Sequence, residues 1–173
     1  VYDLIHRDRL LGGRLWRFCR HRNNRGRKRR AKEAGLGKIP NRVGIECRPK
    51  EIEHRATLGH WEGDTVLQGH KQSGLVTLVE RRSGYLLAGR LKRFTANQTT
   101  RTVIRLLRPI RGAAKTLTLD NGSEFAEHEY VAKELDLAAY FCDPYCSGQR
   151  GTNENTNGLL RQYYPKGTNF AKL

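Results

Sequence analysis

Three acidic residues stand in short polar motifs that lie far apart in the chain. Asp64 lies in GHWEGDTV, Asp120 in TLDNGSEF and Glu154 in RGTNENTNGLLRQYYPKG. Carboxylate oxygens are the hard ligands that Mg²⁺ and Mn²⁺ prefer. Two divalent ions held together can activate the attacking oxygen and stabilise the leaving oxygen of a phosphodiester. The three carboxylates therefore indicate an active site that cuts or joins nucleic acid with two Mg²⁺ or Mn²⁺ ions.

The charge of the chain favours the same class of substrate. Its 173 residues include 33 Lys or Arg against 17 Asp or Glu, a net charge of +16. Residues 1–50 hold 16 basic against 4 acidic residues, and residues 51–173 hold 17 against 13. Such an excess favours a polyanionic partner, because each neutralised phosphate releases counterions. We therefore expect a nucleic acid as the partner, and no membrane; the resemblance described below narrows the partner to double-stranded DNA.

The most basic segment covers residues 14–38 and has almost no apolar periodicity. It contains four consecutive basic residues, Arg27, Lys28, Arg29 and Arg30. A segment of this composition is expected to be disordered alone and to become ordered on DNA. The alternative is a solvated linker that makes no specific contact.

Composition also bears on the cellular location of the protein and on whether it contains disulfides or a zinc site. No apolar run approaches the ~20 residues needed to span a bilayer, and no secretory signal opens the chain, so we expect a soluble intracellular protein. The four cysteines are too few and too scattered for a disulfide framework. Cys142 and Cys146 have no second ligand pair, which disfavours a structural zinc site. The chain contains no Met, begins in what reads as the middle of an element and stops soon after a predicted helix, so we expect a fragment, with the compact domain truncated at its C-terminus; the alternative is an unusual composition.

Apolar and β-branched runs predict an α/β fold with five strands and three helices. The strands are expected at 65–67, 75–80, 84–91, 115–119 and 138–142, and the helices at 96–109, 123–136 and 153–164. A capping box at Thr95 and Gln98 marks the start of the first helix. The order βββαβαβα predicts a mixed five-stranded sheet with helices on both faces. We divide the chain into a basic N-terminal segment, 1–50, and a compact domain, 51–173.

These elements position two of the carboxylates on strands. Asp64 is expected at the start of the first strand and Asp120 at the carboxyl end of the fourth. The two side chains converge at one edge of the sheet if these strands are neighbours. If the first strand begins that early, Glu62 is expected on its opposite face, where two readings stay open: indirect support of metal binding, or a surface role.

The third carboxylate is expected on a polar helix face. At about 100° per residue, Glu154 shares one side of the last helix with Asn157 and Arg161. This side can present a metal ligand and a guanidinium for a phosphate. The opposite side carries Leu159 and Tyr163, and we expect it to pack on the sheet.

Four segments resemble the transposases of bacterial insertion sequences: GHWEGDTV, LVTLVERRSGY, LTLDNGSEF and RGTNENTNGLLRQYYPKGTNF. They are similar in particular to the insertion sequence thirty family, within the DDE transposase and retroviral integrase superfamily. Asp120 and Glu154 are separated by 33 residues, as the spacing of that family requires. The resemblance covers roughly residues 38–173. It implies a ribonuclease H-like fold and metal-dependent cleavage and strand transfer of DNA at the ends of a mobile element.

The resemblance also implies residue roles and partners. Asp64, Asp120 and Glu154 would form the catalytic triad that binds both ions. The expected DNA contacts come from Arg161, Lys166, Asn155, Asn157 and the basic run Arg27, Lys28, Arg29 and Arg30, while Asn121 and Glu62 support the site. The implied partners are terminal inverted repeats and target DNA, bound by a homodimer or a larger assembly. The implied location is the cytoplasm of a bacterium, at the nucleoid.

The sequence departs from the family pattern at two places. Gly148 stands where the family usually has an aromatic residue, which is expected to loosen the loop before Glu154. The family also has a helix-turn-helix region before the catalytic domain, and we expect residues 1–37 to hold only its last part or the linker after it. Two alternatives stay open: a metal-dependent nuclease of the same fold that hydrolyses DNA without strand transfer, and a DNA-binding remnant without catalysis.

Overall fold

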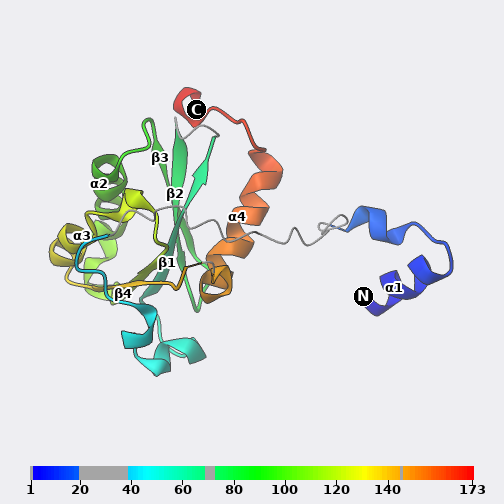
Figure 1. Cartoon of the computed structure of the whole chain (residues 1–173), viewed down its shortest axis with the longest axis horizontal. Helices are drawn as coiled ribbons and strands as arrows, with labels where there is room; N and C mark the ends of the chain where they lie inside the picture. The colour runs from blue at the N-terminus through cyan, green and yellow to red at the C-terminus, as the bar shows by residue number, and fades with distance from the viewer. Residues whose placement is uncertain (1, 20–38, 69–72, 145) are drawn as a thin grey trace. The chain divides into compact units, whose positions relative to one another are not determined.

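A computed structural model describes residues 2–19, 39–68, 73–144 and 146–173 (Figure 1). The chain forms two compact units, Val1–Ala34 and Gly35–Leu173, which are described separately. In the first unit, helix α1 (Tyr2–Leu10) precedes a 3₁₀ turn at Leu15–Phe18. Among the helices of the described residues, none is long and apolar enough to cross a membrane.

The second unit is built on one mixed sheet of five strands. The strands are β1 (His60–Leu67), β2 (Gly74–Glu80), β3 (Leu86–Leu91), β4 (Thr116–Leu119) and β5 (Ala138–Phe141). Their order across the sheet is β3-β2-β1-β4-β5. β2 pairs antiparallel with β1 and β3, whereas β4 pairs parallel with β1 and β5. The predicted mixed five-stranded sheet is confirmed.

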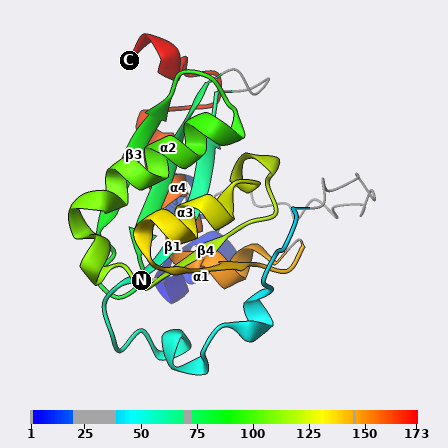
Figure 2. The ribbon, with the colours of Figure 1, turned by 90° about the vertical axis from the view of Figure 1, so that its left-hand side faces the viewer.

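Three helices cover the two faces of this sheet. They are α2 (Ala96–Leu107), α3 (His128–Leu135) and α4 (Gly151–Tyr163). Helices α2 and α3 lie on one face and α4 on the other, as Figure 1 shows; in Figure 2, α2 and α3 lie in front of the sheet. The remaining 3₁₀ turns are Ile45–Cys47, Lys50–His54, Arg108–Ala113, Ser123–Phe125, Ser147–Arg150 and Phe170–Lys172. The predicted order βββαβαβα is also confirmed.

The face under α2 holds the apolar core. Strand β2 contributes Val76 and Leu78, and α2 contributes Val103 and Leu107 to the same buried cluster. Helix α2 begins as the capping box predicts, because the Thr95 hydroxyl accepts a hydrogen bond from the Gln98 amide at 3.3 Å. The helix lies close to β3 because that strand carries a glycine, Gly89. A Cβ there would lie 2.3 Å from the side chain of Thr102.

The opposite face of the sheet, under α4, carries buried polar groups. Glu62 of β1 and Thr77 of β2 are fully buried there, as is Asn153 of α4. Thr77 lies between Val76 and Leu78 in the sequence, and successive strand residues point to opposite faces. One face is therefore packed by apolar side chains and the other is joined to its helix by hydrogen bonds.

Two predicted elements differ from the structure by more than two residues in their bounds. β1 begins at His60, so Asp64 lies in the middle of the strand and not at its start; pairing with β2 and β4 extends the strand through polar residues. The helix predicted over 123–136 is interrupted, because Ser123–Phe125 is a 3₁₀ turn and α3 starts only at His128.

The segment before β1 packs on the same unit. Ile39 and Ile52 are buried, and Gly44 forms an isolated bridge with Phe141 of β5. The side chain of Arg48 reaches the interior, where it donates to the Thr118 hydroxyl at 2.9 Å. Residues 39–54 therefore contribute to the interior of this unit.

Candidate active site

Two of the predicted carboxylates meet on neighbouring strands. In the parallel pairing of β1 with β4, Glu62 lies opposite Thr118. Asp64 and Asp120 each follow two residues later, so they lie at the same level of the sheet. The first and fourth strands are neighbours, which is the condition under which the two side chains were expected to converge.

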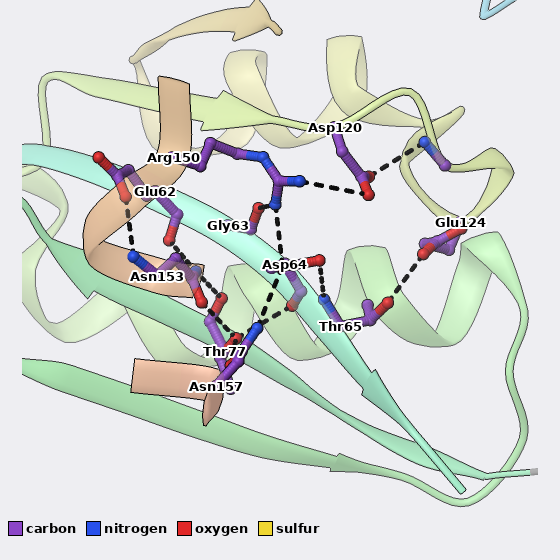
Figure 3. Close-up of polar contacts among 11 residues, drawn as sticks. Glu62, Gly63, Asp64, Thr65, Thr77, Asp120, Glu124, Arg150, Asn153 and Asn157 are labelled. Carbon is purple, nitrogen blue, oxygen red and sulfur yellow. Dashed lines mark hydrogen bonds and ion pairs between the residues drawn. The ribbon is translucent and has the colours of Figure 1, made fainter. Parts of the chain in front are cut away.

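A guanidinium lies between the two carboxylates. Arg150, which immediately precedes α4, is within 3.1 Å of Asp64 Oδ2 through Nη1 and 3.6 Å of Asp120 Oδ2 through Nη2. Its Nη1 also donates to the Gly63 carbonyl at 3.1 Å. Arg150 itself is only 8% exposed. Figure 3 shows this arrangement: one buried cation contacts both aspartates.

Burial and neighbouring charges shift the protonation equilibria of these three groups. Burial raises the pKa of Asp64, as does the charge of Asp120, although Arg150 opposes both effects. Burial likewise raises the pKa of Asp120, with a contribution from Glu124 and against the effect of Arg150. Burial disfavours the charged form of Arg150, yet Asp64 and Asp120 together raise its pKa. The site therefore favours a cation between the two carboxylates.

Further hydrogen bonds orient the carboxylates. The Thr65 amide donates to Asp64 Oδ1 at 2.8 Å, and Asn157 Nδ2 donates to Asp64 Oδ2 at 3.1 Å. The Gly122 amide donates to Asp120 Oδ1 at 3.0 Å. In each case the oxygen that faces Arg150 is Oδ2. The remaining donors thus fix the rotation of both groups toward a shared cation.

Glu154 lies in the first turn of α4, where its side chain is exposed. Its neighbour Asn153 is fully buried and bonded to β1 and β2. Among the described residues, no group of three or more His, Cys, Asp or Glu side chains forms a ready cation site. The structure brings Asp64 and Asp120 together, whereas Glu154 is exposed on α4, next to the buried Asn153.

Helix α4 faces the sheet with its polar side, and not with its apolar side as expected. Its polar residues Asn153 and Asn157 contact the sheet, whereas Leu159 and Tyr163 are 44% and 78% exposed. The prediction that this apolar side packs on the sheet is wrong, because the face of the sheet under α4 itself carries buried polar groups. Asn157 and Arg161 do lie on one side of the helix, but that side faces the sheet.

The expected DNA-contacting residues occupy different environments. Arg161 donates to the carbonyl of Leu67 at the end of β1, and burial lowers its pKa. Asn155 and Lys166 are exposed, on α4 and after it. Arg27, Lys28, Arg29 and Arg30 lie outside the described residues.

The two supporting residues are both engaged. Asn121 Nδ2 donates to the Cys142 carbonyl at 2.7 Å, and its oxygen accepts from Arg42. Glu62 is fully buried and bonded to Arg81 and Asn153. The expectation that Glu62 points away from Asp64 is wrong. Residues two apart in a strand share a face, and both face α4.

Sequence reasoning missed three residues at this site: Arg150, Asn153 and Glu124. Glu124 is 8% exposed and accepts from the Thr65 hydroxyl at 2.9 Å. All three lie inside the polar motifs that carry the carboxylates. Arg150 lies just before α4 and Asn153 in its first turn, where side chains can reach a neighbouring strand. Their position at the start of a helix was the feature of the sequence that could have identified them.

Two other expectations concern the loop before α4. Cys142 is buried, which raises the pKa of its thiol to about 11, while Cys146 is exposed. Gly148 is exposed as well, and a Cβ there would meet no atom within 4 Å. A larger side chain at position 148 therefore has room on this surface.

Comparison with protein families gives one match to a domain family. Residues 54–147, more than half of the chain, match the integrase core domain. This range includes Asp64 and Asp120 and ends before Glu154.

Several curated proteins are similar to the chain. The transposase for insertion sequence element IS4351 of Bacteroides fragilis is 38% identical over 173 residues, which is 100% of this chain and 53% of that protein. Transposase InsI for insertion sequence element IS30A of Escherichia coli is 43% identical over 157 residues, which is 88% of this chain and 40% of that protein. The chain thus spans about half the length of these relatives, or less.

A solved structure shares the fold. A retroviral assembly, described as a simian T-cell lymphotropic virus intasome in complex with PP2A regulatory subunit B56 gamma, matches with a TM-score of 0.53 and 24% identity. The match covers 61% of this chain and 39% of that one. Together with the mixed sheet and its flanking helices, it supports the predicted ribonuclease H-like fold.

Proposed function

The chain belongs to the integrase core domain family, and on that premise we propose that it is the catalytic core of an insertion-sequence transposase. Its reaction is the metal-dependent cleavage of DNA at the end of a mobile element, followed by transfer of the freed strand to target DNA. The observation that carries the proposal is the pair Asp64 and Asp120, which come from neighbouring parallel strands and contact one cation.

The residues present fit a divalent cation at this pair. Two carboxylate oxygens, Oδ2 of Asp64 and Oδ2 of Asp120, already contact the same positive group. Carboxylate oxygens are the ligands that Mg²⁺ and Mn²⁺ prefer. Glu154, one helical turn after Arg150, is our third proposed ligand. Two bound ions would activate the attacking oxygen and stabilise the leaving oxygen of the phosphodiester.

The protein's own groups then act by orientation. The Thr65 amide holds Asp64 and the Gly122 amide holds Asp120, so that both carboxylates keep their rotation when the ligand changes. Such preorganised groups need little rearrangement as charge develops on the transferring phosphate. Asn121 is the residue after Asp120, and its side chain donates to the Cys142 carbonyl. This bond supports the position of Asp120 after the end of β4.

DNA is the proposed substrate, both as terminal inverted repeats and as target. Asn155 is exposed on α4, and Lys166 is exposed after it. Arg161 would contact DNA after giving up the Leu67 carbonyl, and Asn157 after giving up Asp64. The basic segment within residues 1–50 would supply sequence-independent attraction to phosphates, as a linker or remnant of a DNA-binding region. Because the two ends of the mobile element must be handled together, we expect a homodimer or a larger assembly on DNA. Its proposed location is the bacterial cytoplasm, at the nucleoid.

A joining assay tests this proposal. The chain is incubated with a pre-cleaved terminal-repeat oligonucleotide, plasmid DNA and Mg²⁺ or Mn²⁺, and the expected product is the oligonucleotide covalently joined to the plasmid. The matched control is Asp120→Asn, which should bind DNA and give no product. Hydrolysis without joining, or binding with neither reaction, contradicts the proposal.

A further inference from the structure

Four charged side chains form a connected group beneath the candidate site. They are Arg48, Glu53, Glu62 and Arg81, here called the ion network. Arg81 Nη1 donates to Glu62 Oε1 at 2.8 Å, and its Nη2 to Glu53 Oε2 at 3.3 Å. Glu53 also accepts from Arg48. The two arginines balance the two glutamates, and only the side chain of Glu53 is substantially exposed, at 58%.

The ion network contacts each element that carries one of the three proposed catalytic carboxylates. Glu62 is itself part of β1, two residues before Asp64. Arg48 donates to the hydroxyl of Thr118 on β4 at 2.9 Å, two residues before Asp120. Glu62 Oε2 accepts from the Asn153 amide of α4 at 2.9 Å, one residue before Glu154. Three separate segments are thus bonded to one group of charges.

The contact with α4 also compensates for the end of the helix. Backbone amides in the first turn of a helix have no partner within the helix, and a negative charge there is favoured by the helix dipole. Glu62 supplies both the acceptor and the charge from another element. The Asn153 side chain adds bonds to the carbonyls of Glu62 at 2.7 Å and Thr77 at 3.1 Å (Figure 3). These contacts fix both the rotation and the axial position of α4.

Stability alone does not require these charges. Replacing a buried ion pair with apolar residues of similar volume is often neutral or stabilising. Directional hydrogen bonds, by contrast, specify where each partner lies, and here the partners are the neighbours of three proposed catalytic groups.

We propose that the ion network positions the carboxylate triad by fixing α4 against β1 and β4. Glu62 and Arg81 are then positioning residues, because they act through Asn153 and the strands and touch no reacting atom. The proposal rests on the proposed function in one respect: it takes Asp64, Asp120 and Glu154 to be the groups that need alignment.

The decisive variant is Glu62→Gln, which keeps the shape of the side chain and removes its charge. Its control is Glu80→Gln, because Glu80 is also buried and accepts hydrogen bonds, in this case from the turn after β2 and from Gly59 and His60 at the start of β1. Three measurements are made on the whole chain: thermal unfolding, Mn²⁺ affinity by electron paramagnetic resonance, and hydrogen exchange of the amides at the start of α4.

Both variants are expected to lower the unfolding temperature. Only Glu62→Gln should weaken Mn²⁺ binding, by about 10- to 100-fold as for other residues that orient metal ligands, and speed amide exchange at Asn153 and Glu154. Joining should fall through kcat, with DNA affinity unchanged. If Glu62→Gln behaves like Glu80→Gln in Mn²⁺ affinity and in α4 exchange, the network is only structural and the proposal is wrong.

A second variant covers the case in which Glu62→Gln does not fold. Glu53→Gln alters the exposed end of the network and should produce the same changes to a smaller degree; no change in α4 exchange overturns the proposal. If the unaltered chain neither binds Mn²⁺ nor joins DNA, the proposed function fails. The exchange of the α4 amides in Glu62→Gln still decides whether the network positions that helix.

Discussion

Arg150 Nη1 lies 3.1 Å from Asp64 Oδ2, and this contact joins the loop before α4 to the middle of β1. The same guanidinium reaches Asp120. Two nearby carboxylates that are mostly buried repel each other unless a positive charge lies between them. Arg150 is therefore a built-in counter-ion of the aspartate pair, at the position where a divalent ion would bind.

Replacing this counter-ion should make the protein more dependent on divalent ions. Arg150→Gln leaves the two carboxylates without a cation and should cost about 1–3 kcal/mol of folding free energy. The unfolding temperature, measured in a chelator, should then fall by about 2–10 °C. Added Mn²⁺ should restore more of the unfolding temperature in Arg150→Gln than it adds to the unaltered chain. An equal response in both proteins would contradict the counter-ion role.

Conservative changes in the triad should separate chemistry from binding. Asp64→Asn, Asp120→Asn and Glu154→Gln should each abolish strand joining, because an amide is a poor ligand for Mg²⁺ compared with a carboxylate. DNA affinity, measured by fluorescence anisotropy, should stay within about two-fold of the unaltered chain, since most of the affinity comes from basic groups. Substantial joining by any one of them removes that residue from the triad.

Because α4 is bonded to the sheet through polar groups, replacing a polar residue of this helix should destabilise the protein more than replacing an apolar one. Asn153→Ala should destabilise the protein by about 1–3 kcal/mol, because it leaves buried carbonyls of Glu62 and Thr77 without donors. Leu159→Gln should change stability by no more than about 0.5 kcal/mol, since Leu159 is exposed. Urea denaturation measures both. A larger cost for Leu159→Gln would mean that the apolar side of α4 is the buried one.

The number of proposed phosphate contacts can be measured from the salt dependence of DNA binding. Lys166→Gln should weaken DNA binding regardless of sequence and reduce the slope of log affinity against log salt by about 0.9, the value for one phosphate. Changing Arg27, Lys28, Arg29 and Arg30 together to Gln should reduce the slope by about three to four if each contacts a phosphate. An unchanged slope in the second variant favours the solvated linker.

Glu80 gives a prediction for acid stability. Burial alone would raise its pKa, but the hydrogen bonds from Ser83 and from the Gly59 amide outweigh that effect, and the pKa is lowered. A pKa that is lower in the folded state means stability that is present above the unfolded value, about 4.3, and is lost as pH falls. Glu80→Gln should therefore be less stable than the unaltered chain near neutral pH, by about 1–2 kcal/mol. Urea denaturation at several pH values should show this difference shrinking below about pH 4.

The sheet could be predicted from sequence because most of its strands are apolar and β-branched. LVTLVE and KTLTL specify β2 and β4 almost residue by residue. The first half of β1 could not be read in the same way, since His60, Glu62 and Gly63 have low strand preference. Their conformation depends on hydrogen bonds to β2 and β4, which are distant in the chain.

The candidate site was predicted in part for a similar reason. The strand order is enough to bring Asp64 near Asp120. Periodicity failed for α4, because it assumes that the apolar side of a helix faces the interior, whereas the surface beneath this helix carries Glu62 and Thr77. Arg150 was harder to assign, since its position before α4 suggests contact with a strand but nothing local in a Gln-Arg-Gly sequence specifies that the loop brings it between Asp64 and Asp120.

The two sides of the sheet should respond differently to cold. Apolar contacts such as those under α2 weaken on cooling, because burying apolar surface carries a large heat-capacity change. Helix α4 and the turn before it are joined to the sheet by hydrogen bonds and one ion pair, whose release changes the heat capacity far less. As temperature falls, the apolar layer should therefore lose stability before the attachment of α4 does, and the geometry of the catalytic face should persist in the cold.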